Sequence, residues 1–353
     1  MCSEISFILS ESSLFIYPHK LILKTCGTTL NLLGLPRILA IAKEHCGMNK
    51  VTRLFYSRKS FMFPERQTGP HRGWPEEIGY LDAMFTGGAA YTVGKVNGDH
   101  WLLWFFDRSE PASLPTTPRI AFRPPLGISF MEPPPLEEEP PDYTIEILMS
   151  KLGRKSRSHF FFNNSFSGLA DSDHGVGKYE DPWDPHTRAL KLSHALGISS
   201  IFPQALTEID AYAFEPCGYS ANALIKTGPA AQDSEGYWTI HVTPEEGWSY
   251  ASFECNVPLP TIERADELEH TKDDRNVLPN LHQLIKRVVD VFEPANLTLT
   301  LFVSNTTDIS PIENAQAVFC RALTPKGYRR TDKITYEFSG YDLAFASFEL
   351  RTQ

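Results

Sequence analysis

Residues 9–15 are Leu9-Ser10-Glu11-Ser12-Ser13-Leu14-Phe15, and residues 23–29 are Leu23-Lys24-Thr25-Cys26-Gly27-Thr28-Thr29. On its own, a Glu-Ser-Ser segment predicts an ordinary polar loop. A lone cysteine is more often a small buried apolar residue than a reactive one. The interpretation therefore depends on four further segments, which follow in this order: Phe55-Tyr56-Ser57-Arg58-Lys59, Thr144-Ile145-Glu146-Ile147-Leu148-Met149-Ser150, Phe214-Glu215-Pro216-Cys217-Gly218-Tyr219-Ser220 and Tyr237-Trp238-Thr239-Ile240-His241-Val242-Thr243-Pro244-Glu245.

Taken together and in this order, these segments resemble those of eukaryotic S-adenosylmethionine decarboxylase, a pyruvoyl-dependent proenzyme. The resemblance covers most of the chain except about 109–141 and 151–200. It lacks the family's N-terminal segment, because only eleven residues precede Ser12. The fold that it implies is α+β: a four-layer αββα sandwich of two antiparallel sheets flanked by helices, with internal duplication.

Composition sets broader limits. A chain of 353 residues, of which 42% are hydrophobic, can bury a large core in one big domain or two fused ones. The formal charge of -10 argues against nucleic acid or an anionic membrane as the main partner and favours a small cationic ligand. We find no apolar run long enough to cross a bilayer and no signal peptide, so we expect a cytoplasmic protein.

Two segments interrupt the ordered pattern. Residues 109–141 end in a run of prolines and glutamates that predicts an extended insert. Residues 151–200 lack periodicity over much of their length and predict a loop insert. We therefore expect an N-terminal half at 1–108, which carries the cleavage site and the proton-donor loop, and a C-terminal half at 142–353.

Both halves combine strands with helices. In the first, apolar residues at helical spacing predict a helix that is capped by Thr28 or Thr29 and closed by Gly47. Asn97-Gly98 predicts a hairpin. In the second half we expect two strands within 237–255, a helix over 281–292 and a strand over 297–303. This pattern favours antiparallel sheets covered by helices.

The chemistry of the family requires an electron sink, because decarboxylation of an amino acid leaves a carbanion that no ordinary side chain stabilises. The resemblance implies that Ser12 attacks the carbonyl of Glu11, and that β-elimination and hydrolysis then convert Ser12 into a pyruvoyl group. The substrate amine would form a Schiff base with it. The product would be the aminopropyl donor for spermidine and spermine synthesis, and residues 1–11 would remain as a short chain.

The resemblance also assigns roles to other residues. Ser220 and His241 match the residues that process the chain, and Cys26 matches the proton donor. Alternation places Tyr237, Thr239 and His241 on one polar strand face, where a histidine is commonly just solvated. The residues expected to bind S-adenosylmethionine are Leu9, Glu11, Phe214 and Glu245.

A second set matches the site at which some family members bind putrescine as an activator: Lys24, Phe55, Asp142, Thr144, Glu146, Glu254, Phe302 and Tyr341. Buried carboxylates need a counter-cation to stay ionised, which a diamine would supply. We therefore expect Asp142, Glu146 and Glu254 to converge in one buried pocket near Phe302. We also expect a homodimer of cleaved protomers.

Other interpretations stay open. The short N-terminus is compatible with a truncated gene model, a shortened enzyme, or a catalytically weak homologue that acts as a regulatory or binding subunit. Cys26 and His241 could instead form a thiol hydrolase. The six cysteines include no C-x-x-C pair and no zinc-ligand spacing with histidine, so we expect free thiols and no metal.

Overall fold

The computed structural model describes residues 5–9, 12–108, 142–162, 184–226, 235–260, 277–304, 312–338 and 340–351. Glu11 and the Pro/acidic insert at 109–141 lie outside the described residues. The described strands form one eight-stranded antiparallel sheet and two three-stranded antiparallel sheets.

The eight-stranded sheet comes entirely from the C-terminal part of the chain. Its order is β13-β14-β12-β7-β11-β10-β9-β8. The strands are β7 (Tyr143–Ser150), β8 (Thr207–Ala213), β9 (Tyr219–Lys226), β10 (Glu235–Thr243), β11 (Tyr250–Cys255), β12 (Asn296–Ser304), β13 (Tyr328–Phe338) and β14 (Tyr341–Leu350).

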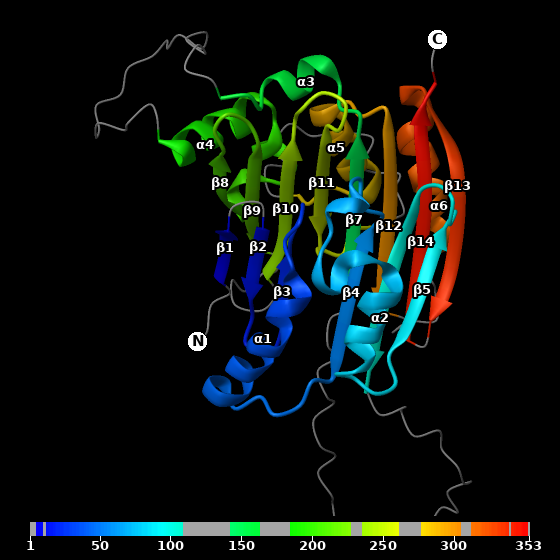
Figure 1. The fold of residues 1–353 in the computed structure, drawn as a ribbon. Helices are drawn as coiled ribbons and strands as arrows, with labels where there is room; N and C mark the ends of the chain where they lie inside the picture. The colour runs from blue at the N-terminus through cyan, green and yellow to red at the C-terminus, as the bar shows by residue number, and fades with distance from the viewer. Residues whose placement is uncertain are drawn as a thin grey trace, which may run out of the picture.

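The N-terminal strands form the layer that faces this sheet (Figure 1). One three-stranded sheet has the order β1-β2-β3, and the other has the order β4-β6-β5. Among the described residues no ladder joins β3 to β4, so this layer is two adjacent sheets rather than one continuous sheet. The strands are β1 (Ile5–Leu9), β2 (Ser12–Ile16), β3 (Leu21–Lys24), β4 (Arg53–Lys59), β5 (Ala89–Gly94) and β6 (His100–Asp107).

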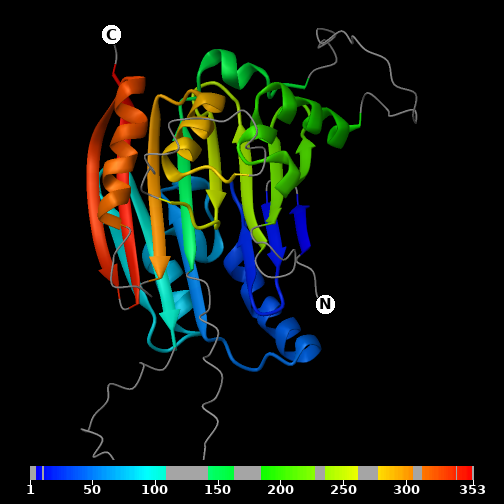
Figure 2. The ribbon, with the colours of Figure 1, turned by 180° about the vertical axis from the view of Figure 1, so that it is seen from behind.

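Helices cover the outer faces of both layers. On one side, α1 (Asn31–Cys46) and α2 (Trp74–Asp82) share a core with Trp104 and Phe106 of β6. On the other side, α4 (Pro185–Ala195), α5 (Leu281–Phe292) and α6 (Ile312–Leu323) pack on the eight-stranded sheet, as Figure 2 shows. The short α3 (Arg154–Ser158) contacts α5. The predicted α+β sandwich of antiparallel sheets flanked by helices is confirmed.

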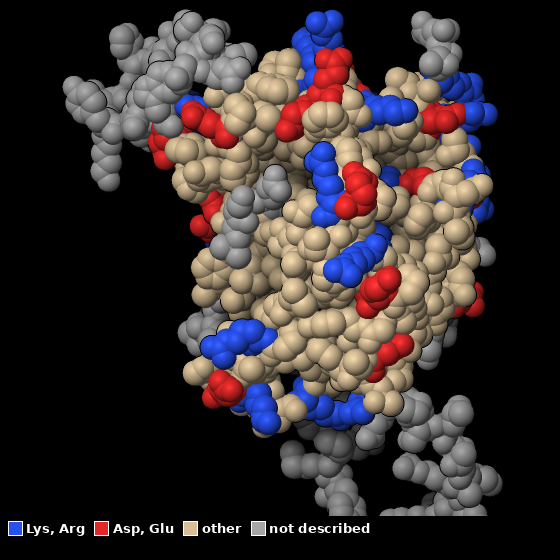
Figure 3. All heavy atoms as spheres, viewed as in Figure 1, with Lys and Arg blue, Asp and Glu red and all other residues tan. Residues whose placement is uncertain are grey.

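The space between the layers holds two apolar cores and a polar region. Leu103 and Phe105 pack against Leu343 and Phe345 at one end, and Phe15 packs against Tyr237 at the other. On the outer face seen in Figure 3, acidic and basic side chains of the described residues are interspersed rather than gathered by sign.

Several local predictions are confirmed. The Asn97-Gly98 hairpin joins β5 to β6, and residues 237–255 form β10 and β11. Helix α5 begins with a capping box between Asn280 and Gln283 and ends just before Pro294. Gly47 closes α1 in the left-handed conformation.

Two local predictions are wrong. The N-cap of α1 is Leu30, which makes no side-chain cap hydrogen bond, rather than Thr28 or Thr29. The loop insert expected at about 151–200 contains α3 and α4 in its two described parts, and its middle, 163–183, lies outside the described residues. Helix α4 forms because Asp184 accepts a hydrogen bond from the Thr187 amide at 2.7 Å, and because Ala189 and Leu192 pack on the core.

A buried charge network joins α2 to β4. The Glu77 carboxylate is 0% exposed and accepts hydrogen bonds from Arg58 Nε at 2.9 Å and from the Tyr56 hydroxyl at 2.7 Å. His71 Nδ1 lies 2.8 Å from it. Because these partners share one buried negative charge, the network should be sensitive to the loss of that charge at Glu77.

We expect Glu77→Gln to lower the free energy of unfolding by about 3 kcal/mol, because it leaves Arg58 facing an amide that cannot neutralise it. The matched control is Glu76→Gln, at the exposed neighbouring position, which should change it by less than about 0.5 kcal/mol. Equilibrium denaturation in urea measures both. Equal effects at the two positions would contradict the network's importance.

Candidate functional site

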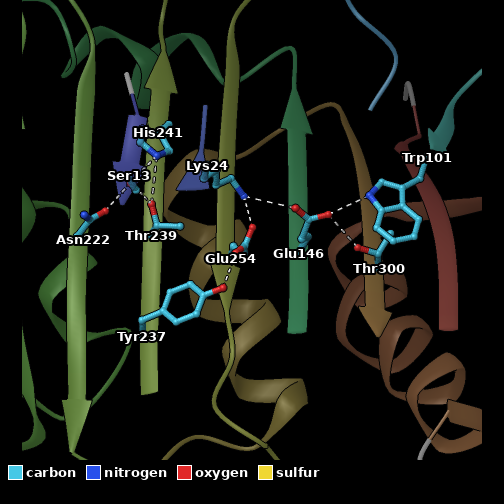
Figure 4. A network of polar contacts seen from close by, with 10 residues as sticks. All are labelled: Ser13, Lys24, Trp101, Glu146, Asn222, Tyr237, Thr239, His241, Glu254 and Thr300. Carbon is cyan, nitrogen blue, oxygen red and sulfur yellow. Dashed lines mark hydrogen bonds and ion pairs between the residues drawn. The ribbon is translucent and has the colours of Figure 1, made fainter. Parts of the chain in front are cut away.

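One row of polar side chains crosses the inner face of the eight-stranded sheet. In the strand register, Asn222 lies opposite Thr239, Thr239 opposite Glu254, Glu254 opposite Glu146, and Glu146 opposite Thr300. These five side chains come from five neighbouring strands, and we call them the polar row. Figure 4 shows them facing β2, β3 and Trp101 of the other layer. Most of the row is buried, so its hydrogen bonds must be made within the protein.

Ser13 of β2 meets one end of the row. Its hydroxyl lies 2.6 Å from Asn222 Oδ1, 3.0 Å from Thr239 Oγ1 and 2.9 Å from His241 Nε2. On the other side of the imidazole ring, His241 Nδ1 lies 2.9 Å from Ser220 Oγ. We call these residues the serine–histidine cluster: Ser13, Ser220, Asn222, Thr239 and His241.

The imidazole of His241 is held neutral. Burial is the main reason that its pKa falls to about 3, and the nearby positive charge of Lys24 lowers it further, whereas Glu254 opposes this. A neutral imidazole carries one hydrogen and one lone pair. At neutral pH His241 can therefore donate a hydrogen bond from one nitrogen and accept one at the other, and both nitrogens lie beside serine hydroxyls.

Lys24 of β3 meets the middle of the row. Its ammonium lies 2.5 Å from Glu254 Oε2 and 3.4 Å from Glu146 Oε1. The Tyr237 hydroxyl donates to Glu254 Oε1 at 2.5 Å. Trp101 Nε1 and the Thr300 hydroxyl donate to Glu146 Oε2 at 3.1 and 3.3 Å. Figure 4 shows this lysine–glutamate cluster beside Ser13, Asn222, Thr239 and His241 of the serine–histidine cluster.

The two carboxylates respond differently to burial. For Glu146, burial is the largest effect and raises the pKa, and repulsion from Glu254 adds to it. For Glu254, burial acts in the same direction, but Lys24 and the Tyr237 hydroxyl outweigh it and lower the pKa. Burial alone would lower the pKa of Lys24, yet the two carboxylates raise it well above its ordinary value. Lys24 and Glu254 thus form the ion pair, and Glu146 is the carboxyl group that protonates more readily.

The residues around the expected cleavage site lie next to these clusters. Ser12 is 9% exposed and begins β2, where it pairs with Leu9 of β1. Its hydroxyl makes no hydrogen bond with the described part of the chain, whereas that of its neighbour Ser13 makes several. The register pairs Ser13 with Lys24. Cys26 follows Lys24 by two residues and therefore lies towards the end of β2 that carries Ser12.

The residues expected to bind the nucleoside part of the substrate lie at one end of the eight-stranded sheet. Phe214 follows β8, and its amide donates to Gly218 O at 2.9 Å in the turn to β9. Glu245 follows β10. Burial and the neighbouring Glu245 carboxylate raise the pKa of Cys217 to about 11, so Glu245 faces the turn that contains Phe214.

The predicted convergence of three carboxylates is wrong for Asp142. Glu146 and Glu254 meet, but Asp142 precedes β7, and its side chain is 43% exposed. It accepts hydrogen bonds from Arg53 Nη1 at 3.3 Å and from the Tyr341 hydroxyl at 2.9 Å. The remaining members of the expected diamine site surround Tyr341: Phe302 stacks on its ring at 4.8 Å, Phe55 lies edge-on at 5.1 Å, and Thr144 pairs with Phe302 in the register.

Several site residues escaped the sequence interpretation. They are Ser13, Trp101, Asn222 and Thr300, and the roles of Tyr237 and Thr239 were also not recognised. Alternation carried a signal for Asn222, because it follows Ser220 by two residues on the same strand face. Ser13 had no such signal, because the face of β2 that meets the other sheet depends on how the layers dock.

Comparison with known proteins bears on the identity of the chain. The family model for adenosylmethionine decarboxylase matches residues 3–349. The chain is 34% identical over 343 residues to the S-adenosylmethionine decarboxylase proenzyme of Xenopus laevis, covering 97% of this chain and 79% of that protein. The chain belongs to the adenosylmethionine decarboxylase family.

Other members of the adenosylmethionine decarboxylase family are similarly related. The proenzyme of Drosophila melanogaster is 33% identical, with 97% of this chain and 80% of that protein covered. The crystal structure of the Trypanosoma brucei AdoMetDC-delta26 monomer matches with a TM-score of 0.59 and 20% identity, over 96% of this chain and 99% of that one. The structural match supports the shared fold.

The geometry also bears on the thiol-hydrolase interpretation. Such an enzyme needs an imidazole nitrogen to activate the cysteine. Here Ser13 and Ser220 take both nitrogens of His241 at 2.9 Å, which leaves none for Cys26. Membership of the decarboxylase family argues in the same direction. Among the described helices, none has the length and apolar character to cross a membrane.

The pKa of His241 makes stability depend on pH. Because its folded-state pKa of about 3 lies below the ordinary value of 6.5, the unfolded chain binds more protons between these values, and stability falls as the pH is lowered through 6.5. We expect His241 to contribute a loss of about 2 kcal/mol in unfolding free energy between pH 7 and pH 5.

Urea denaturation at both pH values measures this loss. The comparison uses Ser12→Ala, which keeps the chain in one covalent form if Ser12 is a cleavage site, and Ser12→Ala/His241→Asn, which lacks the titrating ring. Other histidines contribute equally to both proteins. A pH dependence that is unchanged by the second substitution would show that His241 is not held neutral.

Proposed function

We propose that this chain is an autocatalytically cleaved S-adenosylmethionine decarboxylase that cuts itself between Glu11 and Ser12 and uses the pyruvoyl group made from Ser12. Family membership and the buried serine–histidine cluster beside Ser12 support this proposal. The product would be decarboxylated S-adenosylmethionine, the aminopropyl donor for spermidine and spermine synthesis. We also propose a cytoplasmic location and a homodimer of cleaved protomers.

Ser12 is suitably placed for conversion. It is nearly buried at the start of β2, beside a cluster that includes a neutral imidazole, and the strand holds its backbone through the pairing with Leu9. In the proposed processing, the Ser12 hydroxyl attacks the Glu11 carbonyl and forms an ester. Ser220 stabilises the oxyanion, and His241 takes the Cα proton during β-elimination. Hydrolysis then releases ammonia and leaves the ketone.

The bound ketone supplies an electron sink for decarboxylation. Side chains of the protein would bind the substrate and transfer the proton. Cys26, on the loop that follows β3, would return a proton to the product. Glu245 would bind the ribose hydroxyls, Phe214 would stack on the adenine, and Leu9 and Glu11 would complete the substrate pocket. No metal is required in this scheme.

Self-cleavage is tested by intact-mass analysis of purified protein. We expect a fragment of residues 1–11 and a chain that begins with a blocked residue 12, whereas Ser12→Ala should remain whole. Ser220→Ala and His241→Ala should also block cleavage, because each removes a group needed before the cofactor exists. An uncleaved parent chain would contradict the proposal and would favour a regulatory or binding subunit.

The role of Cys26 is tested separately from processing. We expect Cys26→Ala to cleave normally but to lose decarboxylation by at least about a hundredfold, as is typical for loss of a general acid. Release of carbon dioxide from carboxyl-labelled S-adenosylmethionine measures this. Cys46→Ala, at an exposed position on α1, is the matched control and should keep full activity. Normal turnover by Cys26→Ala would exclude the assignment.

We also propose that Lys24 and Arg53 act as resident cations at the carboxylates where putrescine was expected. Lys24 neutralises Glu254 beside Glu146, and Arg53 pairs with Asp142 beside Tyr341. A diamine would have to displace one of these side chains. The sequence led us to expect carboxylates that attract putrescine. The proposal limits this expectation, because the carboxylates already have cationic side chains beside them.

Removal of Lys24 should therefore create a dependence on diamine. We expect Lys24→Ala to lower stability by about 3 kcal/mol, because it leaves two buried carboxyl groups without a cation. Putrescine should then restore up to about 2.7 kcal/mol at a hundredfold excess over Kd. Thermal unfolding with and without putrescine measures this, with Lys43→Ala on the surface of α1 as control. A parent protein that putrescine stabilises as strongly as Lys24→Ala would contradict the proposal.

A further inference from the structure

The hydrogen bonds of Asn222 determine where the hydrogens of the serine–histidine cluster lie. Its side-chain nitrogen Nδ2 donates to the Phe7 carbonyl oxygen at 3.0 Å. The side-chain oxygen Oδ1 must therefore be the atom that faces Ser13 at 2.6 Å, and a carbonyl oxygen can only accept. The single hydroxyl hydrogen of Ser13 is thus donated to Asn222.

This leaves Ser13 Oγ as an acceptor towards the imidazole. If His241 Nε2 also carried a lone pair, it would face the acceptor Ser13 Oγ at 2.9 Å within a buried cluster, and its donor there would be the more distant Thr239 hydroxyl at 3.2 Å. That arrangement would leave buried polar atoms unsatisfied at considerable cost. All of these atoms are satisfied when His241 Nε2 carries the hydrogen and donates it to Ser13, because the Thr239 hydroxyl can then donate to Ser13 Oγ at 3.0 Å.

The opposite nitrogen follows from the same reasoning. A neutral imidazole with its hydrogen on Nε2 has a lone pair on Nδ1, which can only accept. Ser220, 2.9 Å away, then donates its hydroxyl hydrogen to His241 Nδ1. The hydrogens thus run in one direction, from Ser220 to His241 to Ser13 to Asn222.

We propose that Ser13 is a positioning residue, which together with Asn222 fixes His241 as the Nε2–H tautomer and directs its basic nitrogen at Ser220. This inference rests on the proposed self-cleavage for its functional meaning. In this arrangement the Ser220 hydrogen is committed to His241. Ser220 can donate to an oxyanion at Glu11 only after the direction of the chain of hydrogen bonds reverses, so that the hydroxyl of Ser13 or Thr239 donates to His241 Nε2.

The tautomer is measured directly by nitrogen-15 NMR of histidine-labelled full-length protein at pH 8. Ser12→Ala serves as the parent because it cannot form the ester, and loss of one signal pair in Ser12→Ala/His241→Asn assigns the ring. We expect the parent to show a protonated Nε2 and an unprotonated Nδ1 at His241.

Three substitutions in the Ser12→Ala parent test whether Ser13 and Asn222 cause the preference for the Nε2–H tautomer. Ser13→Ala removes the nearer acceptor of the Nε2 hydrogen and leaves Thr239 Oγ1 at 3.2 Å, free to donate to Nε2 instead. Asn222→Ala frees the Ser13 hydrogen to turn towards His241. Each should reduce the preference and bring up the signal of the Nδ1–H form. Asn222→Asp is a comparison variant: its carboxyl group still offers an oxygen that accepts from Ser13, so Nε2 should stay protonated although the hydrogen bond to Phe7 changes.

An Nδ1–H tautomer in the parent would overturn the proposal. So would an unchanged Nε2–H form in both Ser13→Ala and Asn222→Ala. Because two different positions are changed and thermal unfolding checks that each variant is folded, a single misfolded variant does not decide the result. The measurement uses an uncleaved chain, so it is independent of whether wild-type protein cleaves itself.

Discussion

The ion pair between Lys24 and Glu254 is the interaction on which the arrangement of the site depends. It joins β3 of one layer to β11 of the other at 2.5 Å, in a position where a lone charge of either sign would be costly. Once Lys24 is fixed there, the register of β2 and β3 fixes Ser13 over Asn222 and His241. The same pair holds the strand that leads into the loop with Cys26, so one contact orients both the processing residues and the proposed proton donor.

Much of the eight-stranded sheet's inner face could be predicted from sequence, because strand alternation is local. The pattern of β10 placed Tyr237, Thr239 and His241 on one face, and the structure confirms it. What alternation could not supply is the environment of that face. His241 was expected to be commonly solvated, but it is 6% exposed because a second layer covers it. For the same reason strand alternation placed Ser12 and Ser13 on opposite faces of β2 but could not show which of them faces the eight-stranded sheet.

The misplaced carboxylate has an equally physical explanation. Asp142 and Glu146 are four residues apart, so an extended chain brings them to the same face but separates them by about 13 Å along the strand. It was thus predictable that the two side chains point to the same face of the sheet, but not whether they meet. Arg53 lies close enough to pair with Asp142, and Lys24 reaches Glu146 and Glu254. Asp142 thus pairs with one cation of the other layer, whereas Glu146 and Glu254 share another. In α4, the missed signal was local: an Asp-Pro helix start followed by apolar residues at helical spacing.

The proposed cleavage also requires that the N-terminal piece stays in place afterwards. Strand β1 pairs with β2 over five residues, and Asn222 holds the Phe7 carbonyl from the opposite layer. A cut between Glu11 and Ser12 would break neither contact. The Asn222 side chain therefore acts in two ways. Its nitrogen helps to retain β1, and its oxygen orients the Ser13 hydroxyl that faces His241. Loss of the short chain would free this amide to turn, and the hydrogen positions around His241 would no longer be determined. Retention of β1 and the tautomer of His241 are therefore linked through the same amide group.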